Sequence, residues 1–138
     1  MKLSRSLPQS PQRIPVYSAE QVLKNEAEVA NSQKIPMYGL MVAAGASVFE
    51  HLKKKWPDAK NILVLCGKGN NGGDGFVVAR LAIESGAKVT VLTTCSGEEL
   101  KGDALSAYQA LVQAKTKPGF NKPLEQLRLF HVSSTTFK

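Results

Sequence analysis

The sequence predicts an α/β fold with a mostly parallel sheet, and one central stretch carries most of that prediction. Residues 62–66 are a continuous apolar run bounded by glycine, which is typical of a buried central strand in a parallel sheet. Residues 76–85 are apolar on almost all sides and end at Gly86, which indicates a helix. Residues 88–93 are rich in β-branched side chains and predict the next strand. Together they imply a right-handed crossover between parallel neighbours.

Two helices are expected before this unit. Residues 18–21 form a capping-box pattern, with serine first and glutamine last, so the first helix begins there and runs to about Ala30. The second helix spans 36–55, because proline suits its first position. Small residues at 43–46 allow close approach to a neighbouring element despite the cost of glycine in a helix. The apolar positions at helical spacing are Val22, Leu23, Ala27 and Ala30 in the first helix and Leu40, Met41, Ala44, Val48, Phe49 and Leu52 in the second.

The chain after the central unit predicts one more helix and one more strand. A second capping-box pattern, from Ser96 to Glu99, opens a helix that runs through about Ala114. A turn at 118–119 and a short helical turn at 124–127 precede a third strand at 127–132. The inward side of the helix is expected to carry Leu100, Ala104, Ala107, Tyr108 and Leu111.

Length and composition indicate a single domain with its own core. The chain has 138 residues and 43% hydrophobic content, and it lacks the run of roughly 18 apolar residues that a transmembrane helix needs. We therefore expect no membrane association. Residues 1–15 are expected to form a flexible tail before a domain at 16–138, because three prolines interrupt them. Cys66 and Cys95 lack metal-ligand spacing and fit a reducing, cytoplasmic compartment, with Cys66 as a packed thiol.

The net charge of +7 raises the question of nucleic-acid binding. The basic residues are spread along the chain, and the one cluster, 53–55, lies in the last turn of a predicted helix, where cations favour the helix dipole. Aromatic residues are few and are not interleaved with basic ones. These features argue against a nucleic-acid partner, and the excess charge is better suited to steering a small anion.

The segment between the first strand and its helix is the candidate binding site. It holds five glycines in the nine residues 67–75, and such a segment exposes backbone N–H groups at a helix N-terminus, where anions bind. Gly67-x-Gly69-x-x-Gly72 satisfies the dinucleotide pattern, but the next strand is followed by no acid before Glu98. The Walker pattern also fails, because no Lys-Ser or Lys-Thr pair follows the glycines. A phosphate-bearing ligand therefore remains the first hypothesis, on an unusual loop.

Asp74 is the unusual residue of this segment. A bare carboxylate repels a pyrophosphate, so Asp74 caps the helix, binds sugar hydroxyls or shares a cation. We expect it to cap the helix with one oxygen and to leave the second oxygen for a ribose hydroxyl. The neighbouring glycines at 72, 73 and 75 are also expected to serve turn geometry and close helix packing.

The stretch Cys66-Gly67-Lys68-Gly69-Asn70-Asn71-Gly72-Gly73-Asp74-Gly75, with Val77-Val78-Ala79-Arg80 after it, closely resembles the signature of the NAD(P)H-hydrate epimerases, the YjeF N-terminal domain family. The resemblance covers about residues 16 to 132 and includes Tyr17, Glu26 and the Leu-Met-x-x-Ala-Gly run at 40–45. It implies a Rossmann-like three-layer α/β/α fold with a mostly parallel sheet. It also implies that this chain holds the N-terminal portion of the family domain, truncated on the C-terminal side.

The resemblance also implies a reaction and a set of site residues. Family members interconvert the R and S epimers of hydrated NADH and NADPH, a repair of damaged nucleotides, and associate with an NAD(P)H-hydrate dehydratase as a fused domain or a separate protein. The second asparagine of the family segment binds a potassium ion, which corresponds to Asn71 here. The catalytic acid of the family corresponds to a position beyond residue 138, and a homodimer remains open. The residues implied to contact substrate are Asn70, Asn71, Gly72, Gly73 and Asp74.

Two other classes of function remain open at this stage. The first is a non-catalytic nucleotide-binding module of the same fold, because the chain lacks the later part of the family pattern. The second is an interaction domain for RNA or protein built on that fold. The sequence names no catalytic base, and the preference between NADH and NADPH also remains open.

Overall fold

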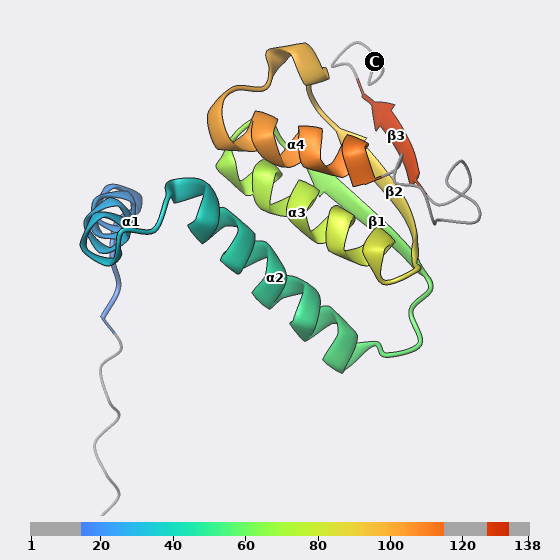
Figure 1. Ribbon diagram of the computed structural model, residues 1–138, viewed down its shortest axis with the longest axis horizontal. Helices are drawn as coiled ribbons and strands as arrows, with labels where there is room; N and C mark the ends of the chain where they lie inside the picture. Colours follow the sequence, from blue (N-terminus) through green and yellow to red (C-terminus); the bar gives the residue numbers. More distant parts are fainter. Residues whose placement is uncertain (1–14, 115–126, 133–138) are drawn as a thin grey trace, which may run out of the picture.

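The computed structural model describes residues 15–114 and 127–132. Residues 1–14 of the tail expected at 1–15, the turn expected at 118–119 and residues 124–126 of the helical turn expected at 124–127 lie outside these ranges. In chain order the elements are α1 (Ala19–Gln33), α2 (Met37–Lys55), β1 (Asn61–Cys66), α3 (Asn70–Glu84), β2 (Lys88–Thr93), the 3-10 helix η1 (Gly97–Glu99), α4 (Gly102–Ala114) and β3 (Leu127–His131) (Figure 1). None of the helices in the described part of the chain is long and apolar enough to cross a membrane.

The described strands form one parallel sheet in the order β1-β2-β3. The register places Val64 of β1 beside Val91 of β2, and Val91 beside Leu129 of β3. Each strand therefore contributes β-branched or leucine side chains to the same rows, as the sequence pattern predicted. The α/β fold with a parallel sheet is confirmed.

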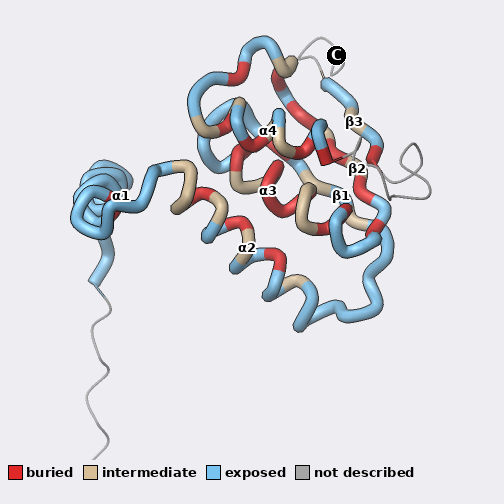
Figure 2. Tube along the Cα trace, in the orientation of Figure 1, coloured by how far each residue is buried: buried red, intermediate tan, exposed pale blue. Residues whose placement is uncertain are grey.

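The core lies between the sheet and the helices that pack on it. In Figure 1, α3 and α4 cover one face of the sheet and α2 packs alongside α3. Figure 2 shows the buried positions concentrated along α3 and the strands behind it. Phe76 is fully buried, and its ring meets the ring of Tyr108 on α4 edge to face at 5.4 Å. The largest fully buried side chains are Phe76, Ile83, Leu111, Val77, Val89, Val91 and Cys66.

The opposite face of the sheet differs from the expectation. The apolar run at 62–66 predicted a strand buried on both faces, yet β1 is the edge strand of the described sheet and its burial alternates. Leu63 is 61% and Leu65 is 72% exposed, because no described element covers that face. Leu65 lies in register with Leu92 and Phe130, which makes an apolar row across three strands. The second helical layer of the expected sandwich is not among the described residues.

The first helix begins as predicted but packs differently. The Ser18 hydroxyl accepts a hydrogen bond from the Gln21 N–H at 3.2 Å, and the Gln21 side chain accepts one from the Ser18 N–H at 2.8 Å, so the capping box is confirmed. The helix continues past Ala30 to Gln33. Its expected apolar side stays exposed except at Ala30, and Figure 1 shows α1 set apart from the body of the domain. The start of this helix is therefore set by its capping box, and burial of its apolar side contributes little.

The second capping box starts a shorter element than predicted. Ser96 and Glu99 cap η1 alone, and α4 begins separately at Gly102. Leu100 between them is extended and only 3% exposed, so its side chain anchors in the core and interrupts the helix. Gly102 has a φ of +56°, a conformation that glycine adopts without strain, and this lets the chain enter α4.

Gly45 brings α2 against α3, as the small residues at 43–46 predicted. A Cβ at this position would lie 2.6 Å from Cγ1 of Val77 and 3.1 Å from the carbonyl oxygen of Asp74. Met41 and Phe49, one turn away on either side, are buried with it. Val48, by contrast, is 55% exposed, so the apolar stripe of α2 is narrower than its sequence indicates.

We expect Gly45→Ala to lower the free energy of unfolding by about 1–3 kcal/mol, since the added methyl group has to displace α3. This net loss already includes the gain of about 1 kcal/mol from alanine's helix propensity. Urea denaturation followed by circular dichroism measures the difference. Ser47→Ala, on the exposed side of the same helix, is the control and should change stability by less than about 0.5 kcal/mol. A Gly45→Ala protein as stable as the parent would contradict the close contact.

Candidate functional site

The site is built where α3 begins. The sequence predicted a loop through Gly75, but α3 starts at Asn70 with Gly69 as its N-cap residue. Only residues 67–69 form the connection, and the Gly73 N–H donates to the Gly69 carbonyl at 3.1 Å to close the first turn. The segment expected to bind substrate, 70–74, is therefore helical. Its two asparagines are exposed at the N-terminus of α3.

Three glycines of the segment are required by packing rather than by turn conformation. A Cβ at Gly72 would collide with the carbonyl group of Gly67, and a Cβ at Gly75 would lie 2.7 Å from Sγ of Cys66. A Cβ at Gly73 would lie 2.6 Å from Sδ of Met41 on α2. The first turns of α3 therefore press directly on the end of β1 and on α2. This confirms the predicted role of these glycines in close helix packing.

Cys66 is buried beneath this contact, as predicted for a packed thiol. It is 2% exposed, and burial raises the pKa of its thiol to about 12, with a smaller contribution from nearby Cys95. A thiol with so high a pKa stays protonated at neutral pH and is a poor nucleophile. Cys66 therefore serves packing at the end of β1.

Asp74 is not a helix cap, and the expectation that it caps with one oxygen is wrong. It is the fifth residue of α3, whereas a capping side chain has to precede the first turn in order to accept from the free backbone N–H groups there. Within residues 15–114 and 127–132 its carboxylate makes no hydrogen bond or ion pair. Burial raises its pKa, and the negative charge of Glu26 on α1 raises it further. Both oxygens of this half-buried carboxylate are thus available to a ligand.

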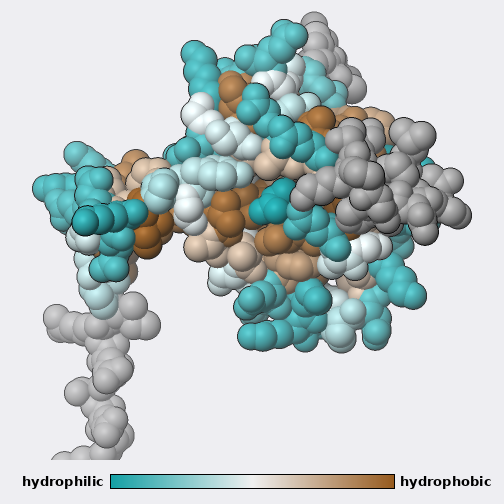
Figure 3. All heavy atoms as spheres, in the orientation of Figure 1, coloured by the Kyte–Doolittle hydropathy of each residue, from teal (hydrophilic) through white to brown (hydrophobic). Residues whose placement is uncertain are grey.

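A cavity of about 760 Å³ brings together four elements next to Asp74. Tyr17 and Glu26 contribute from α1 and the residues before it, and Met41 contributes from α2. Figure 3 shows apolar surface where α1 meets the start of α2. The cavity thus unites Tyr17 and Glu26, which the family resemblance singled out, with three residues of the predicted substrate segment. Those three are Asn70, Asn71 and Asp74.

A second cavity of about 470 Å³ lies over the glycine connection. It is lined by Leu23, Leu65, Gly67, Gly69 and residues 70–72, and no ionisable side chain of the described residues lines it. Asn70 and Asn71 line both cavities, so the asparagine pair separates two compartments of different character. Gly72 belongs to this second cavity, whereas Gly73 is buried under Met41 and lines neither.

Asp103 is a residue of the site that sequence reasoning missed. It is in the first turn of α4, and it lines the larger cavity with Asp74 although the two residues are far apart in the sequence. The order of the elements indicated this position, because helices that follow neighbouring parallel strands begin at the same edge of the sheet, and α3 and α4 follow β1 and β2. Contact between α3 and α4 fixes its position, since a Cβ at Gly73 would lie 3.2 Å from Cα of Ala104.

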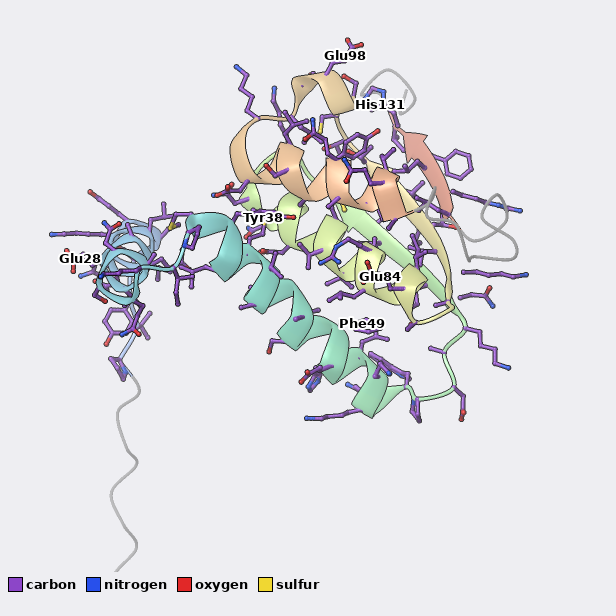
Figure 4. All side chains as sticks on the ribbon, in the orientation of Figure 1. Glu28, Tyr38, Phe49, Glu84, Glu98 and His131 are labelled. Atoms are coloured by element: carbon purple, nitrogen blue, oxygen red, sulfur yellow. The ribbon has the colours of Figure 1, made fainter. Side chains whose placement is uncertain are left out.

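The two histidines lie away from this cavity. His51 is exposed near the end of α2, and His131 is exposed at the end of β3, where Figure 4 shows it near Glu98. No group of three or more His, Cys, Asp or Glu side chains in the described ranges is arranged to hold a metal ion. The site therefore offers carboxylates and amides, with neither a histidine base nor a cluster of strong metal ligands.

The raised pKa of Asp74 makes a prediction about stability. The folded protein holds this proton more tightly than the unfolded chain, so an ionised Asp74 destabilises the fold above its folded pKa. We expect Asp74→Asn to be more stable than the parent at pH 7. The advantage should shrink as the pH falls through the raised pKa, and it should vanish below about 3.9, the ordinary aspartate value. Urea denaturation between about pH 3 and pH 8 measures it.

Asp58→Asn, in the exposed turn after α2, is the matched control for the loss of one carboxylate. If Asp74→Asn were less stable than the parent at pH 7, the ionised carboxylate would have to be stabilised by contacts that the described residues do not make.

Comparison with known proteins identifies the family of this chain. The sequence profile of the family described as YjeF-related protein N-terminus matches residues 37–132. The chain is 40% identical over 111 residues to the Escherichia coli protein named bifunctional NAD(P)H-hydrate repair enzyme Nnr, covering 79% of this chain and 22% of that protein. It is 35% identical over 100 residues to the Rhodopirellula baltica NAD(P)H-hydrate epimerase, covering 72% of this chain and 40% of that one.

A solved structure supports the same fold. The crystal structure of the yeast protein YNL200c superposes with a TM-score of 0.61 at 23% identity, over 91% of this chain and 49% of the yeast chain. The chain thus spans about a fifth of the length of the E. coli relative and about half of the yeast chain. The profile match covers more than half of the 138 residues, and so the chain belongs to the YjeF-related protein N-terminus family.

Proposed function

We propose that this chain contributes to the epimerisation of R- and S-NAD(P)H hydrate, an isomerase reaction in the repair of nicotinamide nucleotides. The observation that carries the proposal is the cavity in which Asn70, Asn71 and Asp74 face residues of α1, α2 and α4. Relatives that match this region are named NAD(P)H-hydrate epimerase or bifunctional NAD(P)H-hydrate repair enzyme. Since the chain spans a fraction of these relatives, the activity is proposed for the domain to which it belongs.

The two cavities suit a dinucleotide. Their volumes, about 760 and 470 Å³, are in the range of small-molecule and cofactor sites. The Asn70 and Asn71 amides line both cavities and can donate and accept hydrogen bonds on either side. The net charge of +7 attracts an anionic substrate from solution. In this proposal Asn70, Asn71 and Asp74 contact the substrate by side chains, while Gly72 and Gly73 allow the helix to approach.

The acid or base that moves the proton lies, in this proposal, outside the 138 residues. Epimerisation of the hydrated carbon needs proton transfer at the ring or at the departing water. Asp74 is the described carboxyl that lines the cavity from the substrate segment, and its unpaired oxygens suit ribose hydroxyls. We assign it to binding, and Asn71 to orientation of the substrate beside it.

Potassium is the proposed cofactor. Asn71 and Asp74 line one cavity and together offer an amide oxygen and an unpaired carboxylate, which are the hard ligands that an alkali cation prefers. The donor set fits a weakly held monovalent ion better than a transition metal, because no described histidine or cysteine faces it. A bound potassium ion would supply positive charge that draws the substrate's oxygen atoms toward Asn71.

The proposed setting is a cytoplasmic repair system. Two free, buried cysteines are compatible with a reducing compartment. The bifunctional relatives support a partnership with an NAD(P)H-hydrate dehydratase, either fused or separate. A homodimer is part of the proposal as well, because α1 exposes apolar side chains on a helix set apart from the domain.

A coupled assay tests the function. The protein is incubated with R-enriched NADPH hydrate and a dehydratase that consumes only the S epimer, and the loss of the R epimer is followed. Acceleration over the dehydratase alone supports epimerase activity. Binding of the hydrate without acceleration would instead support a non-catalytic nucleotide-binding module. If the hydrate does not bind, the proposal is wrong.

The potassium assignment makes a separate prediction. Asn71→Ala should weaken hydrate binding by about tenfold or more, since the proposed substrate and ion each lose an amide ligand. In the parent, replacing potassium by N-methylglucamine at equal ionic strength should weaken binding too. In Asn71→Ala the same replacement should have little further effect. Isothermal titration calorimetry measures all four affinities. Equal potassium dependence in parent and variant would remove Asn71 from the ion site.

A further inference from the structure

Two largely apolar helix faces lie on opposite sides of the larger cavity. The α1 residues that line it recur three and four positions apart, and so do most of the α2 residues, which is the spacing of one face of a helix. The lining residues are Ala19, Val22, Leu23 and Glu26 in α1 and Met37, Leu40, Met41, Ala43 and Ala44 in α2. Asn70, Asn71 and Asp74 of α3 line the same cavity. Its walls are therefore apolar, and its polar groups come from the proposed substrate segment.

The helix α1 is anchored at one end alone. Ala30, near its C-terminus, is 2% exposed, whereas every other residue of α1 is exposed. The Ile35 N–H donates to the Ala30 carbonyl at 2.9 Å, so this end of the helix is held to the connection into α2. That connection consists of residues 34–36. The cavity separates the N-terminal half of α1 from α2.

Leu23 has a particular position on α1. It lines both cavities, which among the described residues Asn70 and Asn71 alone also do. It is 60% exposed, so its side chain has little packing in the free protein. The negative charge of Glu26, three positions further along α1, contributes to the raised pKa of Asp74, so this part of α1 lies within electrostatic reach of α3. Leu23 therefore borders the two cavities where the asparagine pair does, from the α1 side.

The packing of α1 leaves it free to move. A helix of 15 residues is only marginally stable alone in water and depends on burial of its apolar side. The Lys24–Glu28 ion pair, at 3.9 Å, is exposed and adds little to its stability. An element with so few buried apolar contacts opens and closes relative to its domain at small cost.

We infer that α1 is a hinged arm that closes over the nucleotide of the proposed function, with Leu23 and Tyr17 as substrate-contacting residues. The inference rests on the proposed function. A nucleotide bound along Asn70 and Asn71 lies between the faces of α1 and α2, and closure about residues 34–36 brings Leu23 onto it. Tyr17, which lines the larger cavity, supplies an aromatic ring that packs on a flat ring of the nucleotide. Closure also removes water from the site.

A nucleotide fits this space because of its own mixed character. Its rings present flat apolar faces, and its sugar and amide groups form hydrogen bonds. The cavity combines apolar walls from two helices with a few amide and carboxylate groups at one side, which is typical of a small-molecule site. The polar groups thus orient the nucleotide, and the apolar side chains of α1 cover it.

Hydrogen–deuterium exchange with NADPH hydrate tests the closure. At a concentration about a hundredfold above its Kd, the hydrate should slow exchange of the α1 amides at 22–29 on the order of tenfold or more, because the closed arm is stabilised by binding. The amides of β2 should change less, since β2 lines neither of the two cavities.

Variants of α1 test the contacts by isothermal titration calorimetry. Leu23→Ala should weaken hydrate binding about tenfold, because less apolar surface is buried on closure. Leu23→Met keeps the apolar volume and should bind within about twofold of the parent. Tyr17→Phe should likewise retain binding, and Tyr17→Ala should weaken it. Val29→Ala is the matched control and should change nothing, because Val29 is an exposed apolar residue of α1 that lines neither cavity.

Circular dichroism establishes that each variant is folded. If the hydrate binds without slowing exchange of α1, or binds Leu23→Ala as tightly as the parent, the inference is overturned while the proposed function stands. Exchange of α1 that slows with protein concentration but not with hydrate would assign this helix face to a second copy of the chain, which also overturns the inference. If the parent does not bind the hydrate, both are wrong.

Discussion

The contact between the first turn of α3 and the end of β1 is the constraint on which the rest of the structure depends. No side chain fits between Gly72 and the carbonyl of Gly67, or between Gly75 and Cys66. The helix can therefore begin directly against the strand, with its opening residues helical rather than looped. This fixes α3 on the sheet, and Gly45 and Gly73 then set the distances to α2 and α4. The glycines are the most conspicuous feature of the sequence, and they act mainly because they have no side chain to keep these elements apart.

The positions of the polar residues follow from that contact. Because α3 starts at Asn70, the two asparagines stand at its N-terminus and Asp74 lies one turn further on, facing α1. Asn70 and Asn71 consequently line both cavities, whereas Asp74 lines only the larger one. The Asp74 carboxylate is retained there without a partner and with a raised pKa, which is typical of a residue placed for binding rather than stability.

The sequence predicted local features well and long-range ones less well. The Ser18 capping box, the strands predicted at 62–66 and 88–93 and the packed Cys66 follow from nearest neighbours, and all are confirmed. The start of α3 was missed because glycine and asparagine disfavour helices intrinsically, and only tertiary packing at Gly72 and Gly75 overrides that preference. The burial of β1 was overestimated because an apolar run does not show which face of the strand is left without a helix packed on it. Asp103 was missed because its place in the site depends on how α3 and α4 align, which no local pattern encodes.

No described element covers the apolar row formed by Leu65, Leu92 and Phe130 across the sheet. The row begins at Leu65 on β1, and the outer edge of β1 is paired with no described strand. An edge strand with leucines on its accessible side is a template for strand addition, and natural proteins usually blunt such edges with lysine, proline or a covering element. Self-association by this route rises with concentration. Ligand titrations and folding measurements on this chain therefore belong at low micromolar concentration, where bound nucleotide is not confused with oligomer.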